Sequence, residues 1–309
     1  MPNPLNQGQR NVLVLAHTGR SEAVSALTKV VRRFHDAGIR TLMTGEEAQA
    51  LSVADRELVD QCDLEGAVAG AEMVIVLGGD GTILRAAELV RGTDTTLLGV
   101  NLGHVGFLAE AEREEIVGTV ARVVAGDYRV EERMTLGVQV VLDGEVIAKS
   151  WAVNEVSVEK ANRERMLELV MDVDGRPLST FGGDGIIAAT PTGSTAYAFS
   201  AGGPVVWPNV EALLVVPISA HALFARPLVI APTSCLGVEV LPGMGDGGVL
   251  WCDGRRTFTA PVGSRVEVRR SDQTIRLARL STGVFTDRLV AKFGLPVHGW
   301  RGPRSPSGD

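Results

Sequence analysis

Short apolar runs separated by segments of helical spacing open the chain, and they limit the folds that it can adopt. Asn11–His17, Met73–Leu77 and Leu97–Asn101 are such runs, and a further extended segment is expected at Ile39–Met43. Residues at helical spacing follow the first run, and Gly38 stands where that helix would end. The helical positions are Val24, Leu27, Val30, Val31 and Phe34. This alternation predicts a parallel sheet covered by helices.

Beyond Tyr128 the pattern changes to extended segments separated by Asp-Gly pairs. The pairs stand at 143–144, 174–175 and 253–254, and both residue types tolerate the positive φ of a hairpin turn. We therefore expect three regions: an α/β domain over 1–130, an antiparallel, sandwich-like β domain over 131–280, and a tail over 281–309. Phe285–Phe293 in the tail is expected to be a helix that returns to the α/β domain, with a frayed end from Pro303.

Composition narrows the class of protein. The 309 residues are 45% hydrophobic and 22% charged with a net charge of −7, and they show no basic stripe of a nucleic-acid binder. No apolar run approaches the roughly 20 residues of a membrane helix, and no signal-peptide pattern opens the chain. Cys62, Cys235 and Cys252 are scattered, which indicates neither a disulfide framework nor a zinc site. A cytoplasmic protein is expected, and an anionic ligand held by backbone amides stays possible.

The tetrapeptide GGDG occurs twice, and its first copy spans Gly78–Gly81. That copy follows a predicted strand and precedes a predicted helix over Thr82–Val90, with Thr82 near the N-cap. Ligands of open α/β sheets bind at this carboxyl edge. Asp80 would accept a proton from an attacking hydroxyl or hold Mg²⁺ beside phosphates, or else form an ordinary Asp-Gly turn. Since this strand–helix junction matches neither GxxxxGK[ST] nor GxGxxG, the sequence predicts a phosphate-handling site of another kind.

The second copy, Gly182–Gly185, runs into a segment crowded with small and hydroxyl residues between Thr190 and Ser200. Such a segment suits a nucleotide or polyhydroxyl ligand, or is simply a turn whose side chains bond to local backbone. Asn154 and Glu155 are expected in a strand, where an amide reads an adenine edge and a carboxylate accepts from ribose hydroxyls.

In this order, GGDGTILRAA, NLGHVGFLAE, NEVSVEK, GDGIIAATPTGSTAYAFSAGGP and HALFARP resemble the bacterial NAD kinase family, and its actinobacterial branch most. The resemblance extends from Asn11 to about Trp300, and TPTGSTAY is its most specific block. It implies an NAD kinase/diacylglycerol kinase-like fold and phosphorylation of the 2′-hydroxyl of the adenosine ribose of NAD to give NADP. ATP or polyphosphate would be the donor with Mg²⁺ or another divalent cation, in a homodimer or homotetramer whose neighbouring subunit lines part of the pocket.

The resemblance also implies roles for individual residues. Asp80 would activate the 2′-hydroxyl, and Phe107 would stack near the adenine. The NAD-binding residues would be Asp80, Gly81, Arg85, Phe107, Asn154, Glu155, Arg165, Asp184, Thr195, Ala196, Tyr197, Ala198, Phe199 and Ser200. The phosphate-binding residues would be Gly78, Gly79, Gly81 and Thr82. No cluster of protein ligands for a metal is expected, so Mg²⁺ would be held through the donor phosphates and by Asp80.

Several alternatives stay open. His17 and His104 are other possible bases. Phosphofructokinases and lipid kinases share GGDG or a close variant, and a non-catalytic NAD-binding module is a further possibility. The chain also departs from the family at Gly182, where many members carry Arg two residues before the second-motif Asp. The missing guanidinium predicts altered discrimination between NAD and NADH.

Overall fold

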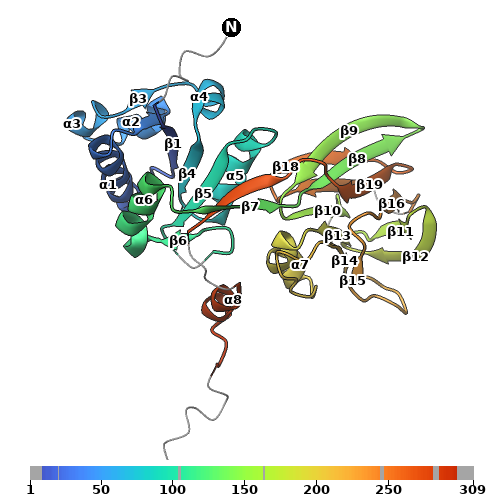
Figure 1. Ribbon diagram of the computed structural model, residues 1–309. Helices are drawn as coiled ribbons and strands as arrows, with labels where there is room; N and C mark the ends of the chain where they lie inside the picture. Colours follow the sequence, from blue (N-terminus) through green and yellow to red (C-terminus); the bar gives the residue numbers. More distant parts are fainter. Residues whose placement is uncertain are drawn as a thin grey trace, which may run out of the picture. The chain divides into compact units, whose positions relative to one another are not determined.

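The computed structural model describes residues 9–19, 21–103, 106–162, 164–243, 247–280 and 285–297. The chain forms two compact units (Figure 1). The first comprises Met1–Glu131 together with Arg276–Asp309, and the second comprises Glu132–Ile275. The chain therefore leaves the first unit once and returns to it at its C-terminal end. No helix in the described ranges is long and apolar enough to cross a membrane.

The first unit is built on a sheet with the strand order β3-β2-β1-β4-β5-β20-β7, and β6 also pairs with β5. The pairs from β3 to β20 are parallel. The four strands predicted from apolar runs are all present, within one or two residues of the expected ends. The strands of this sheet are β1 (Asn11–Ala16), β2 (Arg40–Met43), β3 (Asp60–Gln61), β4 (Met73–Leu77), β5 (Thr96–Asn101), β6 (Ala111–Glu112), β7 (Arg129–Arg133) and β20 (Ile275–Arg279).

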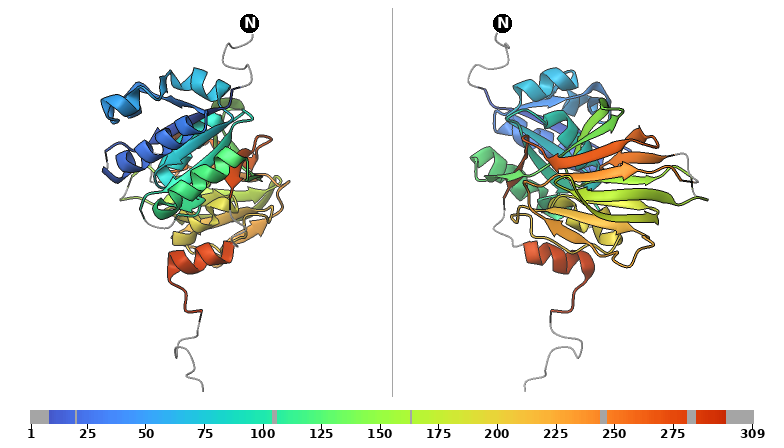
Figure 2. Two further views of the ribbon diagram at one scale, coloured as in Figure 1. Left: turned by 60° about the vertical axis from the view of Figure 1, so that its left-hand side comes forward. Right: turned by 90° about the vertical axis from the view of Figure 1, so that its right-hand side faces the viewer.

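Helices cover both faces of this sheet, so successive residues of its central strands, which point to opposite faces, are all buried. Val12 and Val14 of β1 pack in one core with Leu27 and Phe34, while Leu13 on the opposite face is equally buried. The predicted first helix is confirmed and is followed by Gly38 at φ +69°. Figure 2 shows this helix, α1, beside α6. The helices of the unit are α1 (Ser21–Asp36), α2 (Gly45–Gln49), α3 (Val53–Arg56), α4 (Leu64–Gly70), α5 (Asp80–Val90), η1 (Arg113–Glu115), α6 (Ile116–Ala125) and α8 (Phe285–Phe293).

The second unit is a sandwich of two six-stranded antiparallel sheets. One, which we call the β10 sheet, has the order β15 (Leu228–Ile230), β14 (Leu213–Ile218), β13 (Gly185–Ala189), β10 (Glu155–Lys160), β17 (Gly248–Cys252) and β18 (Arg256–Ala260). The other, the β11 sheet, has the order β12 (Arg176–Gly183), β11 (Leu167–Val173), β16 (Leu236–Val240), β19 (Arg265–Arg270), β8 (Leu136–Leu142) and β9 (Glu145–Ala152). Their inner faces share one apolar core. The predicted fold class, an α/β domain followed by an antiparallel β domain, is confirmed.

All three Asp-Gly pairs turn hairpins as predicted. Asp143, Asp174 and Asp253 have φ values of 52°, 54° and 52°, and the glycine after each is also at positive φ. The first two loops contain two residues, since Leu142 pairs with Glu145 and Val173 with Arg176. The third is one residue longer, because Cys252 pairs with Arg256.

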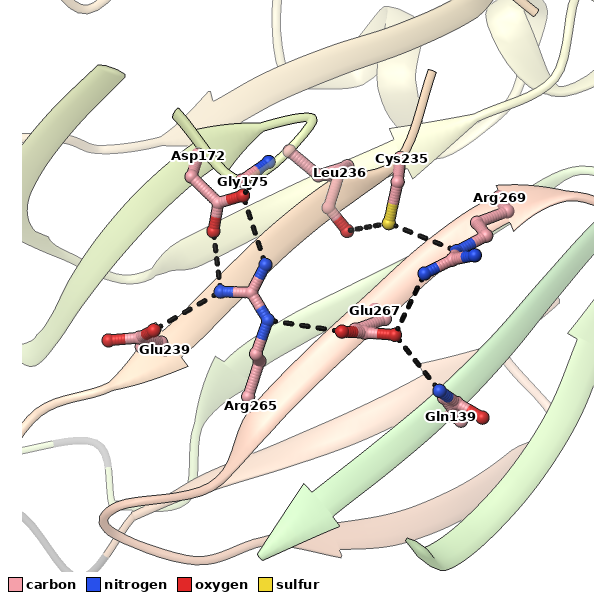
Figure 3. A network of polar contacts seen from close by, with 9 residues as sticks. All are labelled: Gln139, Asp172, Gly175, Cys235, Leu236, Glu239, Arg265, Glu267 and Arg269. Atoms are coloured by element: carbon pink, nitrogen blue, oxygen red, sulfur yellow. Dashed lines mark hydrogen bonds and ion pairs between the residues drawn. The ribbon is translucent and has the colours of Figure 1, made fainter. Parts of the chain in front are cut away.

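The outer face of the β11 sheet carries a polar network (Figure 3). Arg265 bonds both carboxylate oxygens of Asp172, at 2.6 and 3.0 Å, and also reaches Glu239 and Glu267. Gly237 lies on β16 between Asp172 and Glu267. A β-carbon at Gly237 would overlap both the Arg265 guanidinium and the Asp172 carboxylate. The bidentate Arg265–Asp172 pair therefore requires glycine at position 237.

We expect Gly237→Ala to destabilise the second unit by about 2–4 kcal/mol, because Asp172 would stay buried with its ion pair broken. Gly137→Ala is the matched control on the same sheet, since its β-carbon would lie no closer than 3.9 Å to a neighbouring atom. Urea unfolding followed by tryptophan fluorescence measures both variants, because Trp151, Trp207 and Trp251 all belong to this unit. Equal stability of the two variants would contradict the assigned role of Gly237.

Candidate active site

The first GGDG copy forms the junction between β4 and α5. The helix begins at Asp80 with Gly79 as its N-cap, two residues before the predicted start at Thr82. An acid in the first helical turn is favoured by the helix dipole, which explains the earlier start. A β-carbon at Gly78 would lie 2.7 Å from the Thr82 hydroxyl, so this turn requires glycine. The junction presents the N-terminus of an 11-residue helix, which is suited to binding an anion.

The Asp80 carboxylate is held by a segment distant in sequence. One oxygen accepts the backbone N–H of Phe107 and the other that of Leu108, each at 3.2 Å. A β-carbon at Gly106 would overlap the carboxylate, so this approach needs glycine there. Asp80 remains partly exposed. Since a carboxylate has about four acceptor positions, the two amides fix its orientation and leave acceptor capacity for a ligand.

A cavity of about 250 Å³ adjoins this junction within the first unit. Thr82 and Arg85 of α5 line it together with Glu46 and Glu47 of α2, and its apolar wall includes Leu15, Leu64 and Leu89. Burial raises the pKa of Glu47, and one of its carboxylate oxygens is buried with no hydrogen-bond partner in the described part of the chain. The cavity therefore combines an apolar wall, a cation and an acceptor, which suits a nucleoside or another polar organic group.

Of the two histidines considered as possible bases, only His17 belongs to the residues that the structure describes. His17 directly follows β1, is exposed, and donates its backbone N–H to Leu77 O at the start of the first GGDG junction. His104 lies outside the described residues.

The second GGDG copy is a corner between the two sheets of the sandwich. β12 of the β11 sheet ends at Gly183, and β13 of the β10 sheet begins at Gly185. A β-carbon at Gly185 would overlap Val158 O, which makes glycine obligatory at this crossing. Between them, the Asp184 carboxylate forms a 2.5 Å ion pair with Lys160. The hydrogen bond from Lys160, followed by that from Ser219, lowers the pKa of Asp184.

Polar side chains follow one face of β10. Val156 and Val158 point into the core, so Glu155, Ser157 and Glu159 lie on the outer face of the β10 sheet. Tyr197 of α7 (Tyr197–Ser200) donates its backbone N–H to Glu155, and its hydroxyl bonds to Glu159. The structure thus brings the predicted Glu155 and Tyr197 together on one surface of the second unit.

The TPTGSTAY segment packs against the corner that precedes β10. Asn154 was predicted within a strand, but β10 begins one residue later, at Glu155. Asn154 O accepts the N–H of Thr190 at 2.9 Å and would be overlapped by a β-carbon at Gly193. The hydroxyl of Thr190 donates to Val153 O. Those of Ser194 and Thr195, in the turn η2 (Thr192–Thr195), donate to carbonyls three residues earlier. These three hydroxyls therefore bond to backbone, as expected if the segment is a turn.

The remaining predicted residues differ in exposure. Ala198 is fully buried against Ile187 and Leu214. Tyr197 and Phe199 are 37% and 39% exposed, and Arg165 is exposed in the segment before β11. The Phe107 ring lies beside Phe285 and Phe293 of α8. No group of three or more His, Cys, Asp or Glu residues suited to a metal occurs among the residues that the structure describes.

Glu155 is a carboxyl in an apolar setting, 7% exposed, with one oxygen that has no partner in the described chain. Burial, followed by the charge of nearby Asp253, raises its pKa to about 8. Burial also raises the pKa of Asp253, against the opposing effect of backbone amides and of the Arg256 charge. Glu155 is therefore neutral at pH 7 and offers a donor as well as an acceptor.

Asp253 is a site-supporting residue that the sequence analysis missed, since it was interpreted only as part of a turn. Its carboxylate accepts the N–H groups of Val153 and Asn154, at 2.9 and 2.7 Å, where the chain passes from β9 to β10. Arg256 pairs with it at 3.0 Å and stacks on Trp151, 4.6 Å from the ring centroid. The available signal was the Asp-Gly pair itself, but its long-range partners leave no local pattern.

A carboxylate with remaining acceptor capacity, at a glycine-rich helix N-terminus that can bind phosphate, is suited to phosphoryl transfer. Two family models match the chain: the ATP-NAD kinase N-terminal domain over residues 12–128 and the ATP-NAD kinase C-terminal domain over residues 153–280. The chain is 61% identical to an NAD kinase of Leifsonia xyli subsp. xyli, over 96% of this chain and 98% of that protein. It is 57% identical to NAD kinase 2 of Streptomyces coelicolor, over 95% and 97%. The chain belongs to the NAD kinase family.

Solved structures share the fold. A yeast NADH kinase complexed with NADH superposes with a TM-score of 0.84 at 22% identity, covering 94% of this chain and 89% of the other. An NAD kinase from Archaeoglobus fulgidus in complex with ATP gives a TM-score of 0.68 at 23% identity, covering 92% and 97%. The resemblance to the NAD kinase family and its actinobacterial members is thus confirmed.

The buried Glu155 makes a pH-dependent contribution to stability. An unfolded glutamate loses its proton near pH 4.3, whereas folded Glu155 keeps its proton until about pH 8. Between these values the folded state binds more protons, so stability falls as pH rises through this window and levels off above it. Between pH 5 and pH 8, we expect the free energy of unfolding to fall less for Glu155→Gln than for wild type. The difference between the two decreases should be on the order of a few kcal/mol.

Urea unfolding at several pH values measures this difference. Glu145→Gln, at an exposed hairpin position, is the control and should follow the wild-type curve. If the Glu155→Gln curve ran parallel to wild type over the whole window, Glu155 would be ionised in the folded protein.

Proposed function

We propose that this chain phosphorylates NAD to NADP by transferring the γ-phosphoryl group of ATP to the 2′-hydroxyl of the adenosine ribose, with Asp80 as general base. The observation that carries the proposal is the Asp80 carboxylate, oriented by the amides of Phe107 and Leu108 at the N-terminus of α5. A base must be held in one orientation and still have acceptor capacity for the proton that it takes. Asp80 meets both conditions.

The mechanism asks for little covalent chemistry from the protein. The amides at the start of α5, from Gly79 to Gly81, would stabilise the donor phosphates, whereas the Thr82 N–H already donates to Gly79 O at 2.9 Å. Arg85 adds a cation on the same helix. As the new O–P bond forms, Asp80 accepts the proton of the 2′-hydroxyl, and the bond between the γ-phosphorus and its bridging oxygen breaks to release ADP. Positioning and electrostatic stabilisation supply most of the rate enhancement.

A divalent cation fits this donor set. Asp80 keeps acceptor capacity after its two amide bonds, and oxygen ligands are those that Mg²⁺ prefers, alongside substrate phosphates. Asp80 together with the donor phosphates would hold the ion. When bound, Mg²⁺ neutralises negative charge on the phosphates.

The second unit would hold the acceptor dinucleotide. Glu155, unpaired at one oxygen, would meet ribose hydroxyls, and Asn154 would meet the adenine edge. Asp184, with its partner Lys160, stands at the other end of β10. Five residues of strand separate Glu155 from Lys160, which corresponds to about 17 Å, so a ligand that reaches both must be extended. Arg165, Thr195, Ala196, Tyr197, Phe199 and Ser200 are proposed as further contacts with NAD. Ala198, predicted with them, is fully buried and is not retained as a contact.

The donor is proposed to be ATP because the cavity beside Thr82 and Arg85 has room for a nucleoside, which polyphosphate lacks. We also propose a homodimer or homotetramer, because a neighbouring subunit is expected to line part of the pocket. Light scattering that showed a monomer would contradict this proposal.

NADP formation with ATP and with polyphosphate, measured side by side, tests both the activity and the choice of donor. A panel of NAD, diacylglycerol and fructose 6-phosphate separates it from other GGDG kinases, and NAD binding without turnover would leave only a sensing module.

The two GGDG copies provide matched variants. Asp80→Asn should lower kcat by about 10²- to 10⁴-fold, the usual contribution of a general base, with little change in the Kd for NAD. Asp184→Asn should mainly raise the KM for NAD, since that acid is proposed to contact the acceptor. Steady-state kinetics and calorimetric NAD binding distinguish the two effects. Near-normal turnover of Asp80→Asn would leave Asp80 only a metal-holding or positioning role.

Gly182 allows a test of cofactor discrimination. A side chain at this position would begin 3.7 Å from Met166, which is ordinary van der Waals contact, so Gly182→Arg can be accommodated. The added guanidinium should change the ratio of kcat/KM for NAD and NADH, by about tenfold if it interacts with one nicotinamide form only. An unchanged ratio rejects the idea that the missing arginine affects this choice. Gly182→Ala is the control for the change of backbone entropy alone.

A further inference from the structure

The C-terminal helix α8 packs on the segment that holds Asp80. The Phe107 ring lies between two phenylalanines of α8, with centroid distances of 5.8 Å to Phe285 and 5.9 Å to Phe293. Both pairs are tilted, by 38° and 43°, at separations typical of attractive aromatic contacts. Phe285 and Phe293 are eight residues apart and so lie on the same side of the helix.

A buried ion cluster joins the same elements. Glu110 is the centre of this cluster, and its side chain is only 1% exposed. Its carboxylate pairs with Arg279 at 2.9 Å and with Arg288 of α8 at 2.5 Å, and it accepts the N–H of Leu280 at 2.9 Å. Arg288 also donates to Phe107 O at 3.5 Å. Since a buried carboxylate is costly without partners, α8 supplies part of what keeps Glu110 in place.

These contacts form a continuous path from α8 to Asp80. Phe107 touches α8 through its ring and its carbonyl, and its N–H donates to the Asp80 carboxylate. The next residue, Leu108, donates to the other carboxylate oxygen. A shift of this segment would therefore move or release the Asp80 carboxylate, since both of its amide donors belong to the segment.

The side of α8 opposite these contacts is open. Asp287 and Ala291 on that side are exposed, and none of the described α8 residues is fully buried. The helix thus adds little to the apolar core of the first unit. Its two phenylalanines and Arg288 contact the segment from Gly106 to Glu110.

We infer that α8 is a positioning element for phosphoryl transfer, in which Phe285, Arg288 and Phe293 hold the Gly106–Glu110 segment so that its amides orient Asp80. The inference rests on the proposed function of Asp80 as the general base. Displacements of the order of 1 Å in a catalytic group lower turnover strongly, so loss of these contacts should affect rate before it affects folding.

The test is the double variant Phe285→Ala/Phe293→Ala, made in the full chain. We expect kcat for NADP formation to fall by about 10- to 100-fold. Hydrogen exchange at the amides of Phe107 and Leu108 should become faster, while exchange in the central strand β4 stays unchanged. Phe285→Tyr/Phe293→Tyr keeps both rings and should restore turnover and amide protection. Asp287→Asn, on the exposed side of α8, should behave as wild type in both measurements.

Two results would overturn the inference: wild-type turnover in the double alanine variant, or reduced turnover with unchanged exchange at Phe107 and Leu108. Arg288→Ala is the second variant if the double variant does not fold, and it should produce the same paired change. The exchange measurement needs no catalysis. Failure of the wild-type protein to form NADP would therefore reject the proposed function, whereas unchanged exchange would reject the role of α8.

Discussion

The contact between Asp80 and the backbone of Phe107 and Leu108 is the interaction on which the proposed phosphoryl-transfer site depends. It fixes both oxygens of a carboxylate that stands on the first turn of α5. It also requires glycine at position 106, because a β-carbon there would overlap the carboxylate. The acid, the glycine-containing partner segment and the helix N-terminus thus form one structural unit, although 27 residues separate Asp80 from Phe107.

The repeated tetrapeptide shows how the surrounding fold gives one sequence two tasks. In the first copy, the glycines allow a tight passage from a parallel strand into a helix, and the acid lies at the sheet edge where α/β proteins bind ligands. In the second copy, Gly185 allows two backbones to meet as the chain crosses between sheets, and Asp184 is paired with Lys160. A carboxylate engaged by an ammonium group is a poor candidate for accepting a proton, so the two copies are not interchangeable.

Local patterns were sufficient to predict the architecture. Strands β1 and β4, helix α1 and the three Asp-Gly hairpins follow from apolar periodicity and turn chemistry that involve neighbouring residues only. The motifs also identified the two acid-bearing loops. The short elements α2, α3 and β3 were not predicted, because they are too brief to show a period. Strand β20 is a short extended segment like the strands before it, and nothing local indicates that it pairs with β5 of the first unit.

The supporting contacts of the site could not be predicted for the same reason. Asp253 has the sequence signature of a hairpin, yet its carboxylate also holds the backbone 99 and 100 residues earlier in the chain. Phe107 belongs to a recognisable motif, but nothing nearby in sequence indicates that Phe285 and Phe293 lie beside its ring. Such contacts are properties of the folded chain, and a pattern read within a short window contains no information about them.

Three acids of the site illustrate what burial and partners do to one chemical group. Asp184 is paired with a lysine and stays ionised, and Glu155 is buried beside Asp253 and stays protonated at neutral pH. Asp80 is partly exposed and is oriented by two neutral amides rather than by a cation. A general base needs an available lone pair and no competing counter-ion, while an acid that recognises a hydroxyl can use either protonation state. By this criterion the environments, rather than the residue types, favour Asp80 over Asp184 and Glu155 as the proposed general base.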